Sequence, residues 1–171
     1  MKKCIILQIN YLILICLFIP CVAIAQPICQ IQRFSAYNGL AQRSVTNILQ
    51  DSKGFIWFST WNGLNKFDGY TFKNYKAFPG DGCTLTSNRF AKITQTQTCD
   101  IWCQTYDERV YLFDSRRERF IDILRPYEDQ RHQSYAVQNI YTLPKGISWI
   151  VCNRGAFRID EQIYKPHERK G

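Results

Sequence analysis

Histidine is scarce in this 171-residue sequence, which has only His132 and His167. Histidine is the most frequent general acid or base in enzymes and a common zinc ligand. Cys99 and Cys103 resemble half of a zinc site, but no second pair of Cys or His at ligand spacing accompanies them. The sequence therefore predicts no catalytic residue, no metal and no cofactor, and it gives little support to an enzyme.

Cysteine is more frequent, with eight residues, but its placement argues against a disulfide framework. Three lie in the apolar N-terminal run, and an odd number remains: Cys29, Cys83, Cys99, Cys103 and Cys152. On one extended strand, Cys99 and Cys103 would have Cα atoms about 13 Å apart. A disulfide needs a Cα separation of about 4.4–6.8 Å. We predict buried free thiols that pack as small hydrophobic side chains.

Long apolar runs are absent after residue 25, so no later segment approaches the ~18 residues of a membrane helix. At the N-terminus, two lysines lead into an apolar run, 4–25, that ends on an Ala-Ile-Ala motif. This pattern predicts a secretory signal peptide over residues 1–25 and a periplasmic or extracytoplasmic domain. An uncleaved membrane anchor stays open, because the run is nearly long enough to span a bilayer. Lipid attachment at Cys21 is a third, weaker option.

A continuous basic stripe is also missing. Without the two N-terminal lysines the chain has 20 basic and 14 acidic residues, a net charge of +6, and the basic residues are scattered. The one dense group, residues 116–119, includes Glu118. Nucleic-acid-binding surfaces need clustered positive charge. We therefore predict no nucleic-acid partner, and only a mild preference for acidic glycans.

What the sequence does contain is a repeat marked by tryptophan. Three tryptophans lie 45 and 47 residues apart: Trp57, Trp102 and Trp149. Apolar residues stand twelve positions before each of them: Val45, Phe90 and Val137. Isoleucines stand nine positions before: Ile48, Ile93 and Ile140. A period in the forties, made of short strands, predicts β-propeller blades.

Turn residues divide each copy into four strands. In the first copy we predict strands at 44–50, 55–60, 63–67 and 71–76, separated by turns with Asp and Gly. The predicted fold is all-β, a partial β-propeller of about three four-stranded antiparallel blades. The blades are expected at residues 44–76, 89–123 and 136–171, with inter-blade loops at 77–88 and 124–135.

Residues 26–43 precede the first blade. Within them, the residues at 34–37 copy Phe72-Lys73-Asn74-Tyr75 of the first blade. We expect an orphan outer strand there, which would complete a blade outside this sequence. Closed propellers have about 4–8 blades, and the C-terminal residues Tyr164-Lys165-Pro166-His167 are expected to stop partway through an outer strand of the third copy. These features predict a truncated product or an excerpt of a longer protein.

The first copy carries specific motifs around its tryptophan. They are Phe34-Ser35-Ala36-Tyr37-Asn38-Gly39-Leu40, Gln50-Asp51-Ser52-Lys53-Gly54-Phe55-Ile56-Trp57 and Thr60-Trp61-Asn62-Gly63-Leu64-Asn65-Lys66-Phe67-Asp68-Gly69. These residues resemble the two-component regulator propeller repeat. The resemblance implies the periplasmic sensor propellers of hybrid histidine kinases, typical of gut Bacteroidetes, which often control polysaccharide use.

The resemblance covers residues 31–160 and weakens in the second copy. That copy has Cys99 in place of a glycine, and Glu108 and Arg109 in place of Gly-Leu. Family members continue with more blades, an immunoglobulin-like module, a membrane helix, a kinase core and output domains. The resemblance therefore implies the N-terminal sensor part of a receptor, not itself an enzyme. Its expected partners are the remaining blades and, in a full-length receptor, a second receptor copy.

Residues that recur in register are interpreted as structural. The repeat tryptophans are expected to pack between blades, and four aspartates are expected at turns: Asp51, Asp68, Asp114 and Asp160. Ligand candidates lie instead in loops on one face around the channel. They are Arg43, Trp61, Asn62, Tyr106, Asp107, Asn153 and Arg154. Aromatic, amide and guanidinium groups are suited to binding an oligosaccharide, and Trp61 is the strongest single candidate. The alternative interpretation is that these are ordinary polar loop residues without a ligand.

We therefore expect a ligand-sensing, glycan-related propeller module of a two-component receptor. Two alternatives stay open. A propeller enzyme acting on polysaccharide would need paired carboxylates or a histidine-centred site. The second alternative is a truncated product without function. An open array of blades exposes sheet edges and apolar faces, so the isolated chain is expected to be marginally folded.

Overall fold

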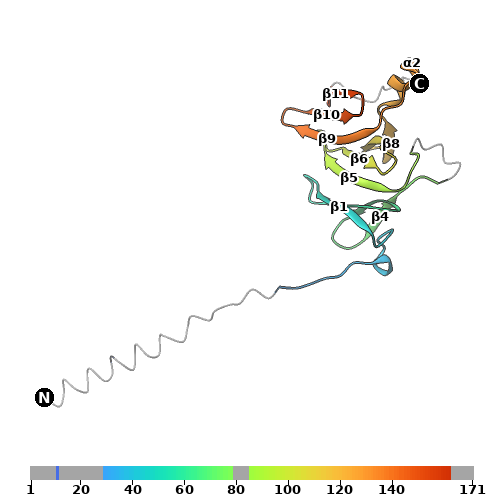
Figure 1. Ribbon diagram of the computed structural model, residues 1–171. Helices are drawn as coiled ribbons and strands as arrows, with labels where there is room; N and C mark the ends of the chain where they lie inside the picture. The colour runs from blue at the N-terminus through green and yellow to red at the C-terminus, as the bar shows by residue number, and fades with distance from the viewer. Residues whose placement is uncertain (1–10, 12–28, 79–84, 163–171) are drawn as a thin grey trace, which may run out of the picture. The chain divides into compact units, whose positions relative to one another are not determined.

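The computed structural model describes residue 11 and residues 29–78 and 85–162 (Figure 1). The chain divides into two units, Met1–Arg33 and Phe34–Gly171. Apart from Tyr11, the predicted signal peptide over residues 1–25 falls outside the described residues, as do Cys83 and the expected outer strand after residue 162. Within the described part, no helix combines the length and the apolarity that a membrane crossing needs.

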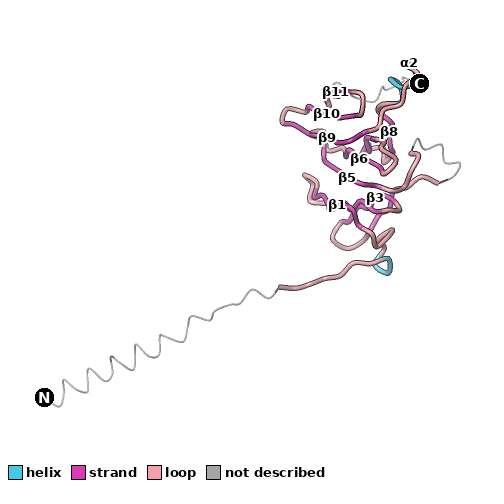
Figure 2. The backbone as a smooth tube through the Cα atoms, viewed as in Figure 1, coloured by secondary structure: helices cyan, strands magenta, loops and turns pink. Residues whose placement is uncertain are grey.

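Three antiparallel β-sheets make up the second unit (Figure 1, Figure 2). Blade 1 consists of β1 (Val45–Gln50), β2 (Ile56–Thr60), β3 (Gly63–Phe67) and β4 (Phe72–Tyr75). Blade 2 consists of β5 (Phe90–Gln95), β6 (Ile101–Thr105), β7 (Val110–Asp114) and β8 (Arg119–Asp122). Blade 3 consists of β9 (Val137–Leu143), β10 (Ile147–Cys152) and β11 (Gly155–Asp160). Strands pair in chain order, so the predicted all-β class is confirmed, with three strands described in blade 3.

Aspartates set the turns between these strands. Asp51 Oδ1 accepts two backbone N–H groups of the turn that follows it, and its Oδ2 accepts the Trp57 Nε1–H at 2.8 Å. Asp68 and Asp114 each accept two backbone N–H groups in later turns. Asp160 accepts one, from the second residue after it. These carboxylates replace backbone acceptors where a strand ends, and they therefore act as turn residues.

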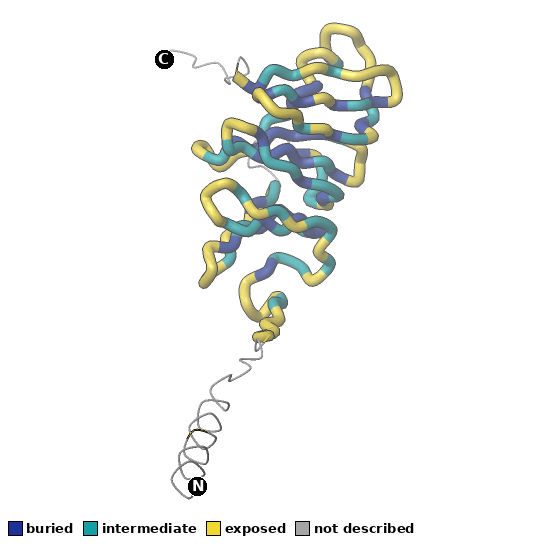
Figure 3. The backbone as a smooth tube through the Cα atoms, turned by 90° about the vertical axis from the view of Figure 1, so that its left-hand side faces the viewer, coloured by how far each residue is buried: buried dark blue, intermediate teal, exposed yellow. Residues whose placement is uncertain are grey.

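The blades pack face to face through two apolar clusters (Figure 3). The first joins blades 1 and 2 and contains Trp57, whose ring centroid lies 5.5 Å from that of Phe113. The second joins blades 2 and 3 around Trp102, whose Nε1–H donates to Ser148 Oγ at 2.9 Å. Both tryptophans are buried. They fill the interface between their own blade and the next, as predicted.

Trp149 does not follow this pattern, and its prediction as a core residue is wrong. It lies in β10 with an exposed side chain, and its cross-strand neighbours Tyr141 and Arg158 are exposed as well. The reason is its position in the repeat. Trp57 and Trp102 contact the next blade, and the described residues place no blade against the corresponding face of blade 3.

The orphan outer strand expected at residues 34–37 is not formed. A 3-10 turn, η2 (Ala36–Asn38), stands there instead. The backbone N–H and the hydroxyl of Ser35 both donate to Asn38 Oδ1, and a glycine in the left-handed region closes the turn. A strand also needs a hydrogen-bonding neighbour, and none of the described strands pairs with this segment. The local side-chain bonds therefore set its conformation.

The inter-blade loop expected at residues 124–135 contains a short helix, α2 (Arg125–Arg131). The helix buries no residue, so periodicity offers no signal for it. An ion-pair network holds it instead. Arg109 donates to Glu128 on the helix at 2.8 Å and to Asp122 at the end of β8 at 2.6 Å. Glu128 also accepts the N–H of Tyr135 at 2.9 Å.

The four described cysteines are free thiols. Cys103 and Cys152 are buried, as predicted, and burial raises the pKa of both thiols. No bridge joins Cys103 to Cys99, which is half-buried. Cys29 is exposed, so the prediction of a buried thiol is wrong there. It precedes the blades in the sequence and belongs to the first unit.

Candidate ligand-binding rim

Backbone hydrogen bonds gather three turns at one edge of the blades. These turns connect β2 to β3, β6 to β7, and β10 to β11. In each, one residue donates its N–H to a carbonyl just before the first strand of its blade: Trp61 to Ser44 (3.3 Å), Tyr106 to Arg89 (2.9 Å) and Asn153 to Ala136 (3.0 Å). We call this edge the rim; it comprises residues 43–44, 61–62, 88–89, 106–107, 136 and 153–154.

Further backbone bonds connect the rim from one blade to the next. The Gly63 N–H in blade 1 donates to Asn88 O, 2.8 Å away, before blade 2. The Val137 N–H in blade 3 donates to Glu108 O, 2.7 Å away, in blade 2. The loops of neighbouring blades are therefore fixed side by side, and they present their side chains on a rigid support.

Trp61 and Tyr106 meet on this rim. Their ring centroids lie 6.1 Å apart, with the ring planes at 83°. The guanidinium carbon of Arg89 lies 5.0 Å from the Trp61 ring centroid, within cation–π range. Trp61 is 43% exposed and Tyr106 is 54% exposed. Two predicted residues thus form, together with Arg89, an exposed cluster of aromatic and guanidinium groups.

Arg89 was missed by sequence reasoning. It stands directly before β5, at the position that Ser44 and Ala136 occupy in the other two copies. Its carbonyl is the acceptor for Tyr106, so the same hydrogen bond that forms the rim brings its side chain next to Trp61. Its position in the repeat, one residue before the first strand of a blade, could have identified Arg89 from the sequence.

Two other predicted residues use their side chains within the fold. The Asp107 carboxylate accepts the Thr86 hydroxyl at 2.6 Å. The Asn153 side-chain oxygen accepts the Ala136 N–H at 3.2 Å. These groups position the rim loops, and their remaining polar atoms face solvent, since both residues are exposed.

The side chains of the last three predicted residues form no hydrogen bond, ion pair or ring contact with the Trp61 cluster in the described part of the chain. Asn62 is half-buried, and its backbone N–H donates to Thr60 Oγ1 at 3.1 Å. Arg43 and Arg154 are exposed. The structure therefore brings together two of the seven predicted residues, Trp61 and Tyr106.

No described carboxylate forms an ion pair with a guanidinium group of the rim. Among the ion pairs of the described residues, none includes Arg43, Arg89 or Arg154. Arg109 differs, because Asp122 and Glu128 both pair with it. The rim therefore offers guanidinium donors beside an aromatic surface, which is suited to binding hydroxyl or carboxylate oxygens.

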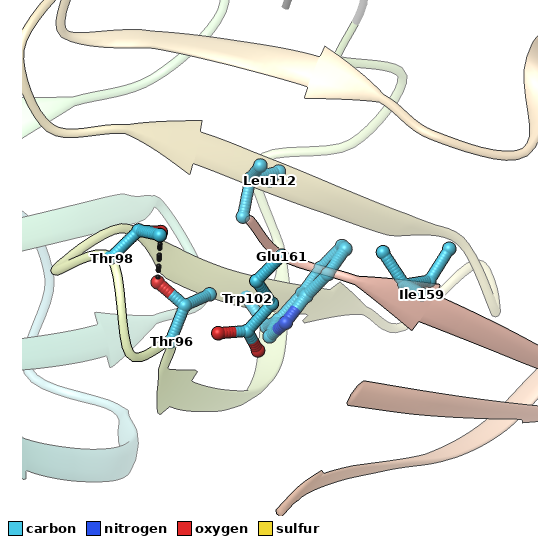
Figure 4. A pocket seen from close by; sticks show the side chains of 6 residues that line it. All are labelled: Thr96, Thr98, Trp102, Leu112, Ile159 and Glu161. Atoms are coloured by element: carbon cyan, nitrogen blue, oxygen red, sulfur yellow. Dashed lines mark hydrogen bonds between the residues drawn. The ribbon is translucent and has the colours of Figure 1, made fainter. Parts of the chain in front are cut away.

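A small cavity between blades 2 and 3 is a separate feature (Figure 4). Its lining residues are Thr96, Thr98, Trp102, Leu112, Ile159 and Glu161. Its volume of about 10 Å³ is near the minimum for one water molecule. The Glu161 carboxylate accepts the Ser148 hydroxyl and the Gln97 N–H. The cavity is thus a satisfied packing feature between blades and has no room for a larger ligand.

Comparison with known families identifies the first blade. Residues 39–62, which include the Trp61 turn, match the family described as the two-component regulator propeller. Part of blade 1 is therefore similar to a two-component regulator propeller repeat. A curated relative of this chain is histidine kinase P4 of Formosa agariphila, 47% identical over 53 residues. The match covers 31% of this chain and 4% of that kinase.

Two solved structures are similar to this chain in fold. The extracellular domain of the hybrid two-component system BT3049 of B. thetaiotaomicron has a TM-score of 0.63 and 27% identity, over 77% of this chain and 19% of that one. The extracellular domain of BT4673 from the same organism has a TM-score of 0.57 and 19% identity, over 81% of this chain and 20% of that one. The chain therefore spans about a fifth of each domain, and it resembles the extracellular domain of a hybrid two-component system.

Proposed function

We propose that this chain is a ligand-sensing propeller module of a two-component receptor, and that its rim binds an oligosaccharide beside Trp61. The observation that carries the proposal is the exposed cluster of Trp61, Tyr106 and Arg89. The similarity to extracellular domains of two-component systems supports a sensing role outside the cytoplasm.

The cluster has the chemistry of a carbohydrate subsite. A sugar ring presents C–H groups that pack on an aromatic face, and hydroxyls that accept and donate hydrogen bonds. Trp61 and Tyr106 stand nearly perpendicular, so two differently oriented aromatic surfaces are available. Arg89 supplies donors that no carboxylate occupies in the described part of the chain. Polar and aromatic groups therefore converge on one small region of the rim.

The proposal extends to the surroundings of the module. We infer export through the apolar segment at residues 1–25, a periplasmic location, and a parent receptor in which further blades and a second receptor copy are partners. The chain spans 4% of the histidine kinase it matches, and kinase activity belongs to such longer proteins. The enzyme alternative stays a prediction that no observation on the described residues favours.

Substitution of Trp61 tests the proposal. Short neutral and uronic-acid-containing oligosaccharides are titrated into the purified chain by isothermal calorimetry. For those that bind, Trp61→Ala should weaken binding about fivefold, because stacking on one aromatic side chain contributes about 1 kcal/mol. Arg89→Gln should weaken binding through lost charge-assisted hydrogen bonds.

Tyr70→Ala is the matched control. Tyr70 is an exposed aromatic residue in the turn between β3 and β4, away from the rim turns. This variant should bind as the unmodified chain does. If the Trp61→Ala variant bound as tightly as the unmodified chain, the rim would not be the binding site. If no oligosaccharide bound to the unmodified chain, the proposal that the ligand is a glycan would be wrong.

A further inference from the structure

Residues 88 and 89 join three segments of the rim. The Asn88 side chain pairs with both backbone groups of Ala77, just after β4: its Oδ1 accepts the Ala77 N–H at 2.7 Å, and its Nδ2 donates to Ala77 O at 2.9 Å. The carbonyl of Asn88 accepts the Gly63 N–H at 2.8 Å, and that of Arg89 accepts the Tyr106 N–H at 2.9 Å. The backbone that carries the Arg89 side chain is therefore held from the end of blade 1 and from the β2–β3 and β6–β7 turns.

Two local features fix this arrangement further. Gly63 has a φ of 116°, and a Cβ at this position would lie 2.8 Å from the carbonyl oxygen of Tyr75. Any side chain there would push the Trp61 turn away from the end of β4, so glycine is required. The Arg89 N–H donates to Ser87 Oγ at 3.1 Å. The cluster of aromatic and guanidinium groups is thus preorganised by the backbone beneath it.

The Arg89 guanidinium keeps its hydrogen-bond donors available. A cation is attracted to an aromatic ring through its charge, and a planar guanidinium carries its five N–H donors in its own plane. Among the described residues, the hydrogen bonds that guanidinium groups donate come from Arg109 and Arg117. Trp61 therefore positions the Arg89 side chain but does not neutralise it.

Positive charge exceeds negative charge at the rim. Its arginines are Arg43, Arg89 and Arg154. Its one carboxylate, that of Asp107, already accepts the Thr86 hydroxyl at 2.6 Å. Glu108, directly after the rim turn, adds a second carboxylate, and the sum stays positive. The rim therefore favours an anionic ligand over a cationic one.

A carboxylate is the anionic group that matches a guanidinium in shape. The two groups are planar and can form two parallel N–H···O bonds, and charge-assisted hydrogen bonds are about twice as strong as neutral ones. Within this chain, Arg109 Nη1 lies 2.8 and 3.1 Å from the two carboxylate oxygens of Glu128. The carboxylate of a uronic acid projects from the edge of the sugar ring, so a ring that packs on Trp61 can place it against the neighbouring Arg89.

We propose that the rim selects oligosaccharides that contain a uronic acid, with Arg89 as the residue that determines this specificity. Its guanidinium binds the carboxylate, and the sugar ring packs on Trp61. This specificity rests on the proposed function, because a uronic acid can be selected only where an oligosaccharide is bound.

Matched pairs of ligands test this specificity. Oligosaccharides of galacturonic or glucuronic acid are compared by isothermal calorimetry with their carboxyl-reduced counterparts, which keep the ring and the linkage but carry a neutral hydroxymethyl group. At least one acidic oligosaccharide should bind the unmodified chain about tenfold more tightly than its neutral counterpart. Sodium chloride, raised from about 0.05 to about 0.5 M, should reduce this preference.

Substitutions of Arg89 identify the group that recognises the carboxylate. Arg89→Gln should abolish the preference, because glutamine donates hydrogen bonds but carries no charge. Arg89→Lys should retain part of it, since the charge is kept and the planar pair of donors is lost. Because Arg89 is exposed, both variants should fold, and near-ultraviolet circular dichroism verifies this.

Arg119→Gln is the matched control. Arg119 is exposed and begins β8, so it lies beyond the end of β7 that is opposite to the rim turn. This variant removes the same charge from the chain as Arg89→Gln does. It should keep the full preference for the acidic oligosaccharide.

The results that would overturn this specificity differ from those that would overturn the proposed function. Equal binding of acidic and neutral oligosaccharides to the unmodified chain excludes selection of a uronic acid but leaves an oligosaccharide site at the rim. A preference that survives in Arg89→Gln, or that disappears in Arg119→Gln, excludes the role of Arg89. If neither kind of oligosaccharide binds, the proposed function itself is wrong.

Discussion

A single aspartate connects a turn to the core at the residue scale. Asp51 accepts two backbone N–H groups and the indole N–H of Trp57, which is buried between blades 1 and 2. The β1–β2 turn and the inter-blade interface therefore share one carboxylate. A turn side chain thus fixes the orientation of a buried core tryptophan.

Asp51→Ala should lower the free energy of unfolding by about 1–3 kcal/mol, because three hydrogen bonds are lost and the Trp57 N–H is left buried without its acceptor. Urea denaturation measures the change from the transition midpoint. The matched variant is Asp68→Ala, which also removes three turn hydrogen bonds but none to a buried tryptophan. The Asp68→Ala variant should lose less free energy of unfolding than the Asp51→Ala variant. Equal losses in the two variants would mean that the hydrogen bond to Trp57 contributes nothing to stability.

Residue-level prediction from the sequence succeeded where the repeat fixes both position and surroundings. Trp57 and Trp102 are in the core as predicted, whereas Trp149 is exposed. All three have the same register, so their difference comes from the next blade and not from local sequence. Arg89 was missed for a related reason, because its contact with Trp61 comes from a neighbouring blade. Register predicts which face a residue occupies, but the partner of that face is a tertiary property.

The short helix α2 is an element held by charge. Arg109 bridges Asp122 and Glu128, whose side chains are largely buried. Arg109, one of the two residues at which the second copy differs from the Gly-Leu of the first, thus attaches the helix to blade 2.

Arg109→Met should destabilise the chain by about 1–3 kcal/mol, since it leaves two partly buried carboxylates without a counter-ion. Hydrogen exchange should accelerate in residues 125–131 more than in the strands. Arg131→Met, an exposed substitution on the same helix, should change neither quantity appreciably. Unchanged exchange in the Arg109 variant would show that the helix is held by other contacts.

Element prediction depended on turn chemistry. The strands of blade 1 were predicted within about two residues, because Asp and Gly mark their ends. Helix α2 and the turn η2 were not predicted. The helix has no buried side to create a periodic pattern, and η2 arises from Ser35 and Asn38 in a segment whose resemblance to β4 indicated a strand. Elements held by a few polar contacts leave little trace in hydrophobic patterns.

The whole molecule should lose stability in acid. Hydrogen bonds, from the Thr71 backbone foremost, hold the pKa of Asp68 below its ordinary value. The Lys73 ammonium and a tyrosine hydroxyl lower the pKa of Glu118. Burial opposes the shift at Asp114, but two backbone N–H groups and a guanidinium lower its pKa overall. At Asp100, burial raises the pKa, so that residue acts in the opposite direction.

The direction in which stability changes with pH follows from proton binding. Carboxyls with a lowered pKa bind fewer protons when folded than when unfolded, so their contribution is present above about pH 4 and is lost as pH falls through their folded values. Urea midpoints should therefore decrease between about pH 5 and pH 3. Glu118→Gln should reduce this slope. A midpoint that rises over the same interval would mean that Asp100, and not the other three, dominates.

The recurrence of one interface through the chain has a consequence for how such proteins change over evolution. In both described interfaces, the face that carries the repeat tryptophan of one blade packs on the face that carries the isoleucine nine positions before the tryptophan of the next blade. Both faces are carried within one repeat length of sequence. Duplication or deletion of a repeat-length gene segment would therefore join surfaces that already fit each other. The number of blades can change without new core residues having to arise, while the rim loops, which the core does not constrain, diverge independently in each copy.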